Sequence, residues 1–451
     1  MSCDCSRRTV LRSLFAGSAL FPAVIQQLLA ESADPLAPRA PQFPAKAKRV
    51  IFMYSPGGVS HVDSYDYKPR LIKAADAGEK NKNGQHYVRP RWQFKPRGDS
   101  GIMVSDLFPH IAESMDDICL IRSMRGDHID HTQATLGIHT GSVTVARPSI
   151  GSWVTYGLGT ENQNLPAFVV LAPKLPYTGA EAWSSNFLPG CYSGTLVTAG
   201  PDPVPNIARL APTQKIEDME LGLIAKLNRQ HQMSHPADPA LTARMKTFET
   251  AFGMQMEMPD VLDFSKETDD TLALYGLERG STKGFAWQCL VARRLAERGV
   301  RFIELIDQGA SNNWDAHADI MTHEPLARNI DQPIAALLRD LKSRGMLSDT
   351  LVVWTTEFGR TPHEDSPNGR NHQNAVYSSW MAGGGAKGGI AWGQSDDFGA
   401  KIAGNEVHVH DFHATILHLL GFDHTRLTFR YAGRDFRLTD VAGNVVGGLL
   451  A

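Results

Sequence analysis

Short apolar runs alternate along this chain with segments of helical period, and this alternation constrains the fold more than any other feature. The apolar runs are residues 49–54, 118–121, 168–172, 302–306 and 350–355. The clearest helical pattern spans residues 326–344, where one face carries Ile330, Ile334, Leu337, Leu338 and Leu341. Strands that are apolar throughout are typical of a sheet covered on both faces. The sequence therefore predicts an α/β fold, with a largely parallel sheet sandwiched by helices.

The N-terminal residues 1–33 have the order of features of an export signal and the start of a linker. A basic stretch with the pair Arg7-Arg8 precedes an apolar stretch at 14–30, and charge returns at Glu31. This order predicts a twin-arginine signal cleaved after Ala30, recognised by the twin-arginine export machinery, and a periplasmic or extracellular protein. The alternative is a buried N-terminal helix. The apolar stretch is too short to span a bilayer comfortably, so we expect no stable membrane span.

The remaining residues 34–451 are expected to form one domain with two insertions, near 74–101 and near 201–279. The first is polar and basic and is expected at the surface, whereas the second is helical in pattern. Its methionines, Met254, Met256 and Met258, are expected to pack in the interior. The formal net charge of -3, from 45 basic and 48 acidic residues, provides no basic field for nucleic acid.

Four polar segments follow predicted strands directly, at residues 57–66, 122–141, 307–317 and 357–372. In an open α/β sheet, ligands bind beyond the carboxyl ends of the strands, so these segments are expected at one edge. They contain the candidate residues Asp63, Asp66, His131, Asp315, His317, Glu357, Arg360, Arg370 and His372. Taken singly, such an Asp is more often a helix cap and such a His an ordinary loop residue. Together, at four strand ends, they favour a metal site, because buried carboxylates without cations are costly.

Hydrolysis of a phosphate or sulfate ester requires neutralised oxygens, an activated nucleophile and a stabilised leaving group. Divalent metals held by Asp, Glu and His, assisted by arginine, supply all three. Such ligands suit zinc, manganese, calcium or magnesium, and the sequence does not distinguish among these cations. The chain has no zinc pattern and no disulfide framework among Cys119, Cys191 and Cys289.

The motifs at these segments also resemble a known family. The segments are 57–69, 314–317, 351–362 with the string Glu-Phe-Gly-Arg-Thr-Pro, 369–372 and 383–385. They are similar to the domain of unknown function 1501 family of bacteria, which is grouped with alkaline phosphatases and sulfatases, over nearly the whole mature chain. The resemblance implies an alkaline-phosphatase/sulfatase-like fold and one metal held by Asp315, His317 and His372. It implies a second, weaker site that draws on Asp63 and Glu357.

The chain departs from the wider superfamily in two places. Phe358 follows Glu357 where the superfamily has an Asp-His pair, and no cysteine lies in the Cys-x-Pro-x-Arg pattern of sulfatases. Where related phosphatases place a Ser or Thr nucleophile, this chain has His131 with Thr132 beside it. Three roles stay open: a metal-activated water as nucleophile, His131 as acid, base or ligand, and Thr132 as nucleophile or helix cap.

The leading hypothesis is an exported, metal-dependent hydrolase of phosphate or sulfate esters carried by a small molecule or a polysaccharide. In this hypothesis Asp63, Asp315, His317, Glu357 and His372 bind metal, and the catalytic groups are His131, Thr132, Arg360 and Arg370. The alternative is a non-catalytic anion- or glycan-binding protein on a degenerate hydrolase scaffold. A third possibility is a transferase or mutase that moves phosphate between hydroxyl groups.

Overall fold

A central sheet organises the protein, for which the computed structural model describes residues 34–205, 207–235 and 238–451. Its strand order in that part of the chain is β12-β4-β11-β8-β1-β7-β5-β6, and β15 pairs with β4. The strands are β1 (Arg49–Tyr54), β4 (Ile118–Arg125), β5 (Phe168–Leu171), β6 (Thr195–Val197), β7 (Phe302–Ile306), β8 (Thr350–Thr355), β11 (Tyr377–Ala382), β12 (Ile390–Trp392) and β15 (Val407–His408). The export signal predicted at residues 1–33 lies outside the described residues.

The sheet is largely parallel, as predicted. Strand β11 pairs antiparallel with both β4 and β8, and the other pairings in the sheet are parallel. Strands β1, β4, β5, β7 and β8 therefore run in the same direction, and their carboxyl ends lie at one edge of the sheet. The predicted strands 49–54, 302–306 and 350–355 match β1, β7 and β8, whereas β4 extends four residues beyond the predicted run to Arg125.

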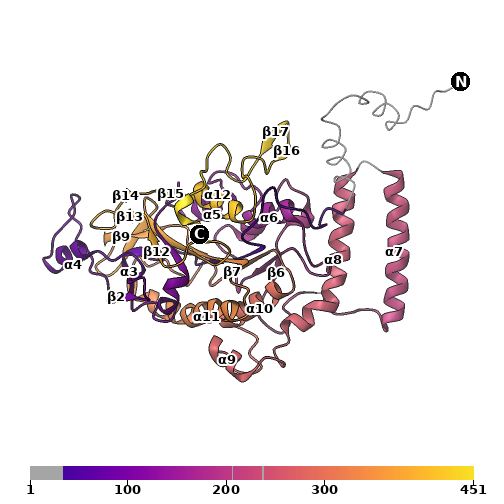
Figure 1. The fold of residues 1–451 in the computed structure, drawn as a ribbon, viewed down its shortest axis with the longest axis horizontal. Coiled ribbons are helices and arrows are strands. Elements are labelled where there is room, and N and C mark those ends of the chain that lie inside the picture. The colour runs from indigo at the N-terminus through magenta and orange to yellow at the C-terminus, as the bar shows by residue number, and fades with distance from the viewer. Residues whose placement is uncertain (1–33, 206, 236–237) are drawn as a thin grey trace.

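Helices cover both faces of the sheet, which explains why its strands are apolar throughout (Figure 1). One core contains Val50, Phe52 and Tyr54 of β1 with residues of α5 (His131–Thr140), α6 (Ile150–Leu158) and α12 (Val409–Leu419). The other core contains Ile51 and Met53 with residues of α10 (Phe285–Glu297) and α11 (His323–Ser343). The helix predicted at 326–344 corresponds to α11. The α/β class with a helix layer on each face is confirmed.

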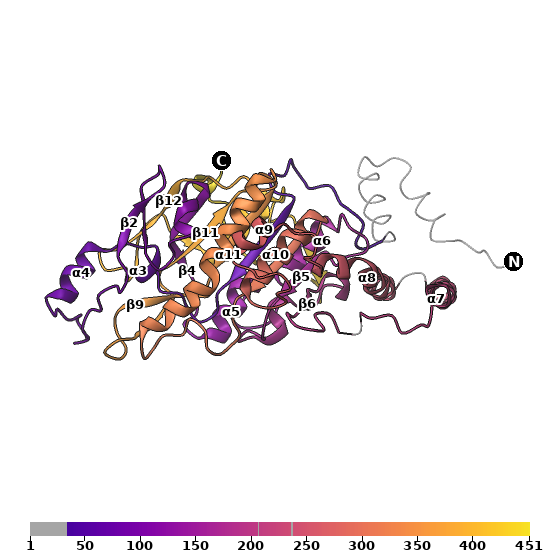
Figure 2. The same cartoon turned by 90° about the horizontal axis from the view of Figure 1, so that it is seen from below.

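The insertion near 201–279 is helical, as predicted. It contains α7 (Gln214–Ser234), α8 (Pro239–Leu262) and α9 (Asp269–Tyr275). Helices α7 and α8 lie side by side and project from the body of the protein (Figures 1 and 2). Met254 and Met258 are buried in the core, but Met256 is 57% exposed, so the packing prediction was wrong for that residue. No described helix has both the length and the apolar character needed to cross a bilayer.

The insertion near 74–101 does more than form a surface. It begins in α4 (Pro69–Asp76) and contains β2 (Phe94–Arg97), which pairs with β3 (Ile102–Ser105). The amide of Val88 donates to the carbonyl of Pro362 at 3.0 Å. Pro362 lies on β9 (Gly359–Glu364), which forms a hairpin with β10 (Arg370–Gln373). This insertion therefore supports the hairpin that carries three of the predicted site residues, Arg360, Arg370 and His372.

Candidate metal centre

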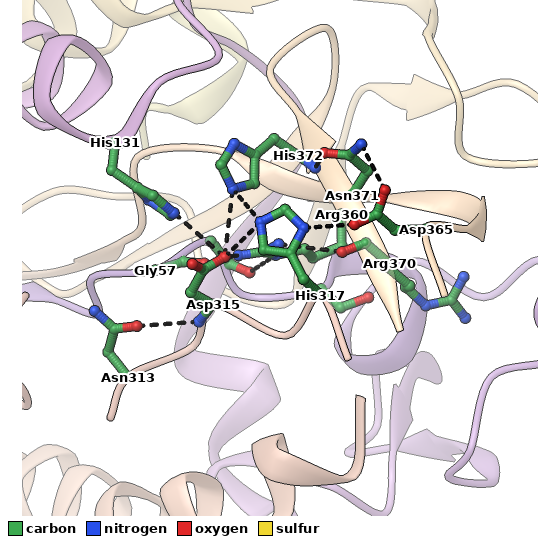
Figure 3. Close-up of polar contacts among 12 residues, drawn as sticks. Gly57, His131, Asn313, Asp315, His317, Arg360, Asp365, Arg370, Asn371 and His372 are labelled. Carbon is green, nitrogen blue, oxygen red and sulfur yellow. Dashed lines mark hydrogen bonds and ion pairs between the residues drawn. The ribbon is translucent and has the colours of Figure 1, made fainter. Parts of the chain in front are cut away.

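Loops at the carboxyl edge of the sheet bring four predicted residues together (Figure 3). His131 is the first residue of α5, whose N-cap Asp130 accepts a hydrogen bond from the amide of Thr132 at 2.9 Å. Asp315 and His317 lie in the loop after β7. His372 lies on β10, opposite Arg360 of β9. Three separate parts of the chain thus meet where the parallel strands end, as the topology predicted.

One carboxylate oxygen, Oδ1 of Asp315, is the centre of this group. The Nε2 atoms of the three imidazoles approach it, at 3.3 Å from His131, 3.0 Å from His317 and 3.3 Å from His372. The Nε2 atoms of His317 and His372 lie 2.8 Å apart. Figure 3 shows all three rings directed at Asp315 from different segments. The arrangement concentrates ring nitrogens around a single oxygen.

The other nitrogen of each ring identifies the atom that is free to bind a cation. Nδ1 of His131 lies 2.7 Å from Oε1 of Glu357, Nδ1 of His317 lies 2.7 Å from Oδ2 of Asp365, and Nδ1 of His372 lies 2.7 Å from the carbonyl of Ile129. Oxygens of these kinds accept hydrogen bonds, so each Nδ1 donates. In the neutral rings, Nε2 then carries a lone pair, and the three lone pairs face the same point. Histidines that bind metals have this second hydrogen bond almost always.

The residues present fit a divalent cation. Ligand atoms of His131, Asp315 and His372 all lie within 4.8 Å of one another. Nε2 of His131 is buried and has no hydrogen-bond partner, which is costly unless a cation or proton satisfies it. Imidazole nitrogens with one carboxylate suit zinc or a similar transition metal. His317, with a side chain 39% exposed, stands beside this set on the side of the solvent.

Electrostatics within the centre couple Asp315 to His131. Burial alone would lower the pKa of His131, but the nearby carboxylates of Asp315 and Glu357 outweigh it and raise this pKa to about 9. Burial alone would raise the pKa of Asp315, yet the hydrogen bonds of His131 and His372 and the charge of Arg360 hold it far below its ordinary value. Asp315 is therefore an anion at neutral pH.

Arg360 and two glycines of the β1 loop hold Asp315 in place. The fully buried guanidinium of Arg360 lies 2.5 Å from Oδ1 of Asp315 and donates to the carbonyls of Gly57 and Gly58. Gly57 has a φ of +112°, and a Cβ there would stand 2.6 Å from the amide nitrogens of Trp314 and Asp315. Only glycine permits this close approach. Arg360 touches the centre, as predicted, but through Asp315.

Glu357, which we predicted as a ligand, lies behind His131 instead. Its Oε1 accepts from the amide of Gly57 at 2.8 Å as well as from His131, and its Oε2 accepts from the hydroxyl of Thr356 at 3.1 Å. Burial alone would raise the pKa of Glu357, but the hydrogen bond and charge of His131 hold it below the ordinary value. Its carboxylate is engaged with protein donors and orients the ring of His131.

Asp63 and Arg370, predicted as a ligand and a catalytic group, form a separate buried ion pair. Nε of Arg370 lies 2.7 Å from Oδ2 of Asp63, and neither side chain is exposed. The hydroxyl of Ser60 and the amide of Arg91 donate to the carboxylate of Asp63, at 2.5 and 3.1 Å. Figure 3 shows the guanidinium of Arg370 directed away from the three rings. The two opposite charges therefore neutralise each other away from the three imidazoles.

Thr132 does not contact the centre. It is exposed, and its amide is bound by Asp130, which is the helix cap in its place. No hydrogen bond of its hydroxyl to His131, Asp315 or His372 is present in the described part of the chain. Of the two roles left open for Thr132, the helix cap is excluded and the nucleophile lacks a contact that would activate it.

The sequence missed residues that support the rings. Tyr177 stacks on His131 with ring centroids 4.2 Å apart and an interplanar angle of 5°, and its hydroxyl accepts from Asn313 at 2.9 Å. Tyr177 follows β5, whose carboxyl end lies at the same edge of the sheet. The expectation that functional residues follow the carboxyl ends of strands was applied to four strands, and applying it to β5 as well would have found Tyr177. Asp365 lies in the polar run between Pro362 and Gly369. Its carboxylate was the feature that could have marked it as a candidate residue.

Several solved structures are similar to this chain at low identity. The PsFucS1 sulfatase from Pseudoalteromonas sp. is 12% identical, with 89% of this chain and 71% of that chain covered and a TM-score of 0.36. The lipoteichoic acid synthase LtaP from Listeria monocytogenes is 8% identical, with 88% and 78% covered and a TM-score of 0.36. The alkaline phosphatase from the Antarctic bacterium TAB5 is 11% identical, with 75% and 92% covered and a TM-score of 0.31. No curated protein matches the chain.

A family model gives a direct assignment. The model, described as protein of unknown function (DUF1501), matches residues 47–450. The match begins just before β1 and ends one residue before the C-terminus, so it includes the whole sheet and all residues of the candidate metal centre. The expectation drawn from the Glu-Phe-Gly-Arg-Thr-Pro string and the glycine motifs is confirmed, and the chain belongs to the domain of unknown function 1501 (DUF1501) family.

Proposed function

We propose that this protein is an exported, metal-dependent hydrolase of phosphate or sulfate esters. One observation carries the proposal: three histidines, each tied through Nδ1 to an oxygen acceptor, direct Nε2 at a single carboxylate oxygen of Asp315. We assign His131, Asp315 and His372 as ligands of one divalent cation, with His317 as a neighbour able to complete the set. The cation's identity, whether zinc, manganese, calcium or magnesium, is a matter for measurement.

The side chains around the centre have distinct tasks in this proposal. Glu357 and Asp365 fix the ring orientation of His131 and His317, and Arg360 fixes Asp315. A bound divalent cation supplies Lewis acidity to the ester oxygens and to the attacking water. The partly exposed side chains of Asp315 and His317, at 31% and 39%, mark the side from which a substrate enters.

Water is the nucleophile that the surroundings favour. Burial raises the pKa of Cys119 and of Cys191 to about 12, and raises that of Cys289 as well, so none of these thiols is activated. Thr132 has no contact with the centre. We therefore assign the nucleophile to a water at the centre and not to a cysteine thiol or the hydroxyl of Thr132.

The type of ester rests on the motifs of the family, which resemble those of alkaline phosphatases and sulfatases. Export rests on the arginine pair at Arg7-Arg8 and the apolar stretch that follows it. A fusion of residues 1–33 to a reporter that is active only after export tests the second point. Replacement of Arg7 and Arg8 by Lys should abolish export if the twin-arginine machinery recognises this signal.

A non-catalytic binding protein is the second candidate, and one observation favours it. No serine or threonine hydroxyl contacts the centre within the described residues, although many esterases of this chemistry use one. In that case the centre would hold a cation or an anionic glycan without turnover. A metal-loaded protein that binds sulfated or phosphorylated ligands and hydrolyses none of a broad set of esters would establish this candidate.

The test combines elemental analysis with a screen of aryl phosphates and aryl sulfates, with each of the four cations added back. The wild type should contain about one equivalent of metal per chain and hydrolyse at least one ester class. His372→Ala should lose both, whereas His110→Ala, at an exposed histidine outside the centre, should keep both. Retention of the metal by His372→Ala would overturn the ligand assignment. Metal without turnover in the wild type would overturn the hydrolase.

A further inference from the structure

A second concave site lies apart from the metal centre, between α4, the end of β4 and the segment that contains β13 (Gln394–Ser395). This pocket has a volume of about 420 Å³. Cavities of about 300–1,000 Å³ accommodate small organic ligands. Its lining consists of Tyr67, Lys68, Pro69, Arg70, Lys73, Arg122, Gln394, Ser395 and Asp397. Nothing in the proposed hydrolysis uses these residues.

The pocket has a net positive charge. Its lining has four basic side chains and one acidic side chain, Asp397. Two of the basic groups have carboxylate partners outside the lining: Nζ of Lys68 lies 3.0 Å from Oδ1 of Asp66, and Arg70 binds Glu79 through two hydrogen bonds. The pairs leave a net positive charge in a protein whose overall charge is -3, so the positive field is local.

The two remaining cations lack carboxylate partners. Lys73 has no ion pair or side-chain hydrogen bond in the described part of the chain. Arg122 donates one long hydrogen bond, 3.4 Å from Nη2 to the carbonyl of Gly393, and its Nε is buried without a partner. A guanidinium offers five donors in a planar fork that matches the oxygens of phosphate and sulfate. Arg122 therefore has donors in reserve for an anion.

The first turn of α4 adds to the attraction. The N-cap Lys68 forms no side-chain cap, the first turn has no acidic residue, and Pro69 and Arg70 of this turn line the pocket. Pro69 has no N–H, but the other amides at the start of a helix carry partial positive charge and lack partners within the helix. The cations and these amides favour the same ligand, a group with several negatively charged oxygens.

The wall of the pocket is connected to the metal centre through one segment. Ser395 and Asp397 line the pocket, and the carbonyl of Ala400, three residues further, accepts a hydrogen bond from the side chain of Gln373 at 2.9 Å. Gln373 follows the proposed ligand His372 on β10. Phe398, between these positions, stacks on Tyr87 at 4.6 Å and lies under the guanidinium of Arg70 at 5.3 Å. These contacts hold the segment against both sites.

We propose that this pocket binds a tetrahedral oxyanion group, a sulfate or phosphate carried on a sugar-sized unit, through Lys73 and Arg122. The volume exceeds what a bare ion needs, and the half-buried ring of Tyr67 provides an apolar wall for the unit that carries the group. The proposal concerns binding and does not depend on hydrolysis at the metal centre. The pocket would hold a second anionic group of a polymer or a separate anionic ligand.

Calorimetric titration of the full mature chain tests this proposal, with His372→Ala in every sample so that the metal centre contributes no anion binding. The probes are a sulfated hexasaccharide of the heparin type, inorganic sulfate and inorganic phosphate, at constant ionic strength. Lys73→Glu and Arg122→Gln should each weaken hexasaccharide binding by about tenfold or more. Lys82→Glu, a charge reversal at an exposed lysine of the neighbouring insertion, should change it less than twofold.

The outcomes decide between sources of the oxyanion. Hexasaccharide binding that is stronger than that of the inorganic ions and sensitive to Lys73→Glu supports the proposal. Inorganic sulfate or phosphate that binds as tightly as the hexasaccharide would overturn the carried-group assignment in favour of a free-ion site. Equal hexasaccharide affinity for Lys73→Glu and Lys82→Glu would overturn the pocket altogether. Arg122 lies on β4 of the central sheet, so its replacement could disturb folding. Lys73 is an exposed residue of α4, and Lys73→Glu is therefore the safer variant.

Discussion

Two groups of charged side chains at the carboxyl edge of the sheet differ in how the protein neutralises them. At Asp63, the charge of Arg370 lies 2.7 Å away and both side chains are fully buried. At Asp315, Arg360 is joined by three imidazoles whose Nε2 atoms face one oxygen. The Asp63 group is electrically neutral without an added ion, whereas the Asp315 group has ring nitrogens that could bind one. Ring nitrogens that converge on one carboxylate oxygen, and not acidic residues as such, distinguish a metal site from a structural ion pair.

The largest effect on metal binding and turnover is expected from replacing Asp315. Asp315→Asn removes the charge that attracts the cation, and we expect bound metal to fall to background and turnover to fall on the order of a thousandfold. Elemental analysis and steady-state turnover measure the two losses. Asp127→Asn, at a partly exposed aspartate paired with His408, is the matched control and should retain both. If Asp315→Asn bound a full equivalent of metal, Asp315 would not be a ligand and the contrast with Asp63 would be wrong.

The structural pair should respond in stability and not in metal content. Asp63→Asn leaves the buried guanidinium of Arg370 without its counter-charge, which we expect to lower the free energy of unfolding by about 3–5 kcal/mol. Urea denaturation followed by fluorescence measures this change. The folded fraction should keep its metal. Loss of metal with unfolding free energy unchanged would instead place Asp63 in the metal centre, as the sequence alone had predicted.

Asp307 is a third buried carboxylate, and it has no ion pair with any described residue. Its pH dependence adds to the comparison. It accepts a hydrogen bond from Nε1 of Trp314 at 2.7 Å, and burial raises its pKa to about 7. The folded protein therefore holds a proton that the unfolded chain releases near pH 4, so stability falls as pH rises from about 4 to 7. Asp307→Asn should lack this part of the pH dependence, a difference of up to about 4 kcal/mol. Denaturation at pH 4.5 and pH 7.5 measures it; parallel curves would contradict the prediction.

The smallest effect is expected at the residues that orient the rings. Glu357→Gln keeps an oxygen for Nδ1 of His131 but removes its charge, and we expect metal affinity to fall about 10- to 100-fold with the fold intact. Competition with a chelator measures affinity. Asp365→Asn should cost less, because Asp365 is 33% exposed and its ring, His317, stands beside the closest ligand set. Equal losses in both variants would make His317 a full ligand.

The sheet was largely predictable because strands that are buried on both faces are continuous apolar runs in the sequence. Strands β1, β7 and β8 coincide with the apolar runs from which they were predicted. The extension of β4 to Arg125 was missed, since Arg122 and Arg125 interrupt the apolar run. Pairing with β11 and β15 keeps these residues in the strand. Tertiary pairing thus overrode a local pattern.

The sequence predicted which residues lie at the candidate site, but it did not predict the role of each residue. The strand-end rule led to His131, Asp315, His317 and His372, which the structure brings together. The same rule admitted Asp63 and Glu357, whose carboxylates are engaged by Arg370 and His131. Residues with the same chemistry at the same edge therefore received the same prediction, although their partners differ.

The sequence by itself determined the α/β class, the family and the segments that meet at the sheet edge, because periodicity and short motifs are local properties of a chain. The tertiary structure decided which nitrogen of each histidine is free and which carboxylate is already neutralised. Asp63 and Arg370 lie 307 positions apart, and His131 and Glu357 lie 226 apart. Electrostatic energy depends on distance in space, so only the folded chain separates a ligand from a counter-ion.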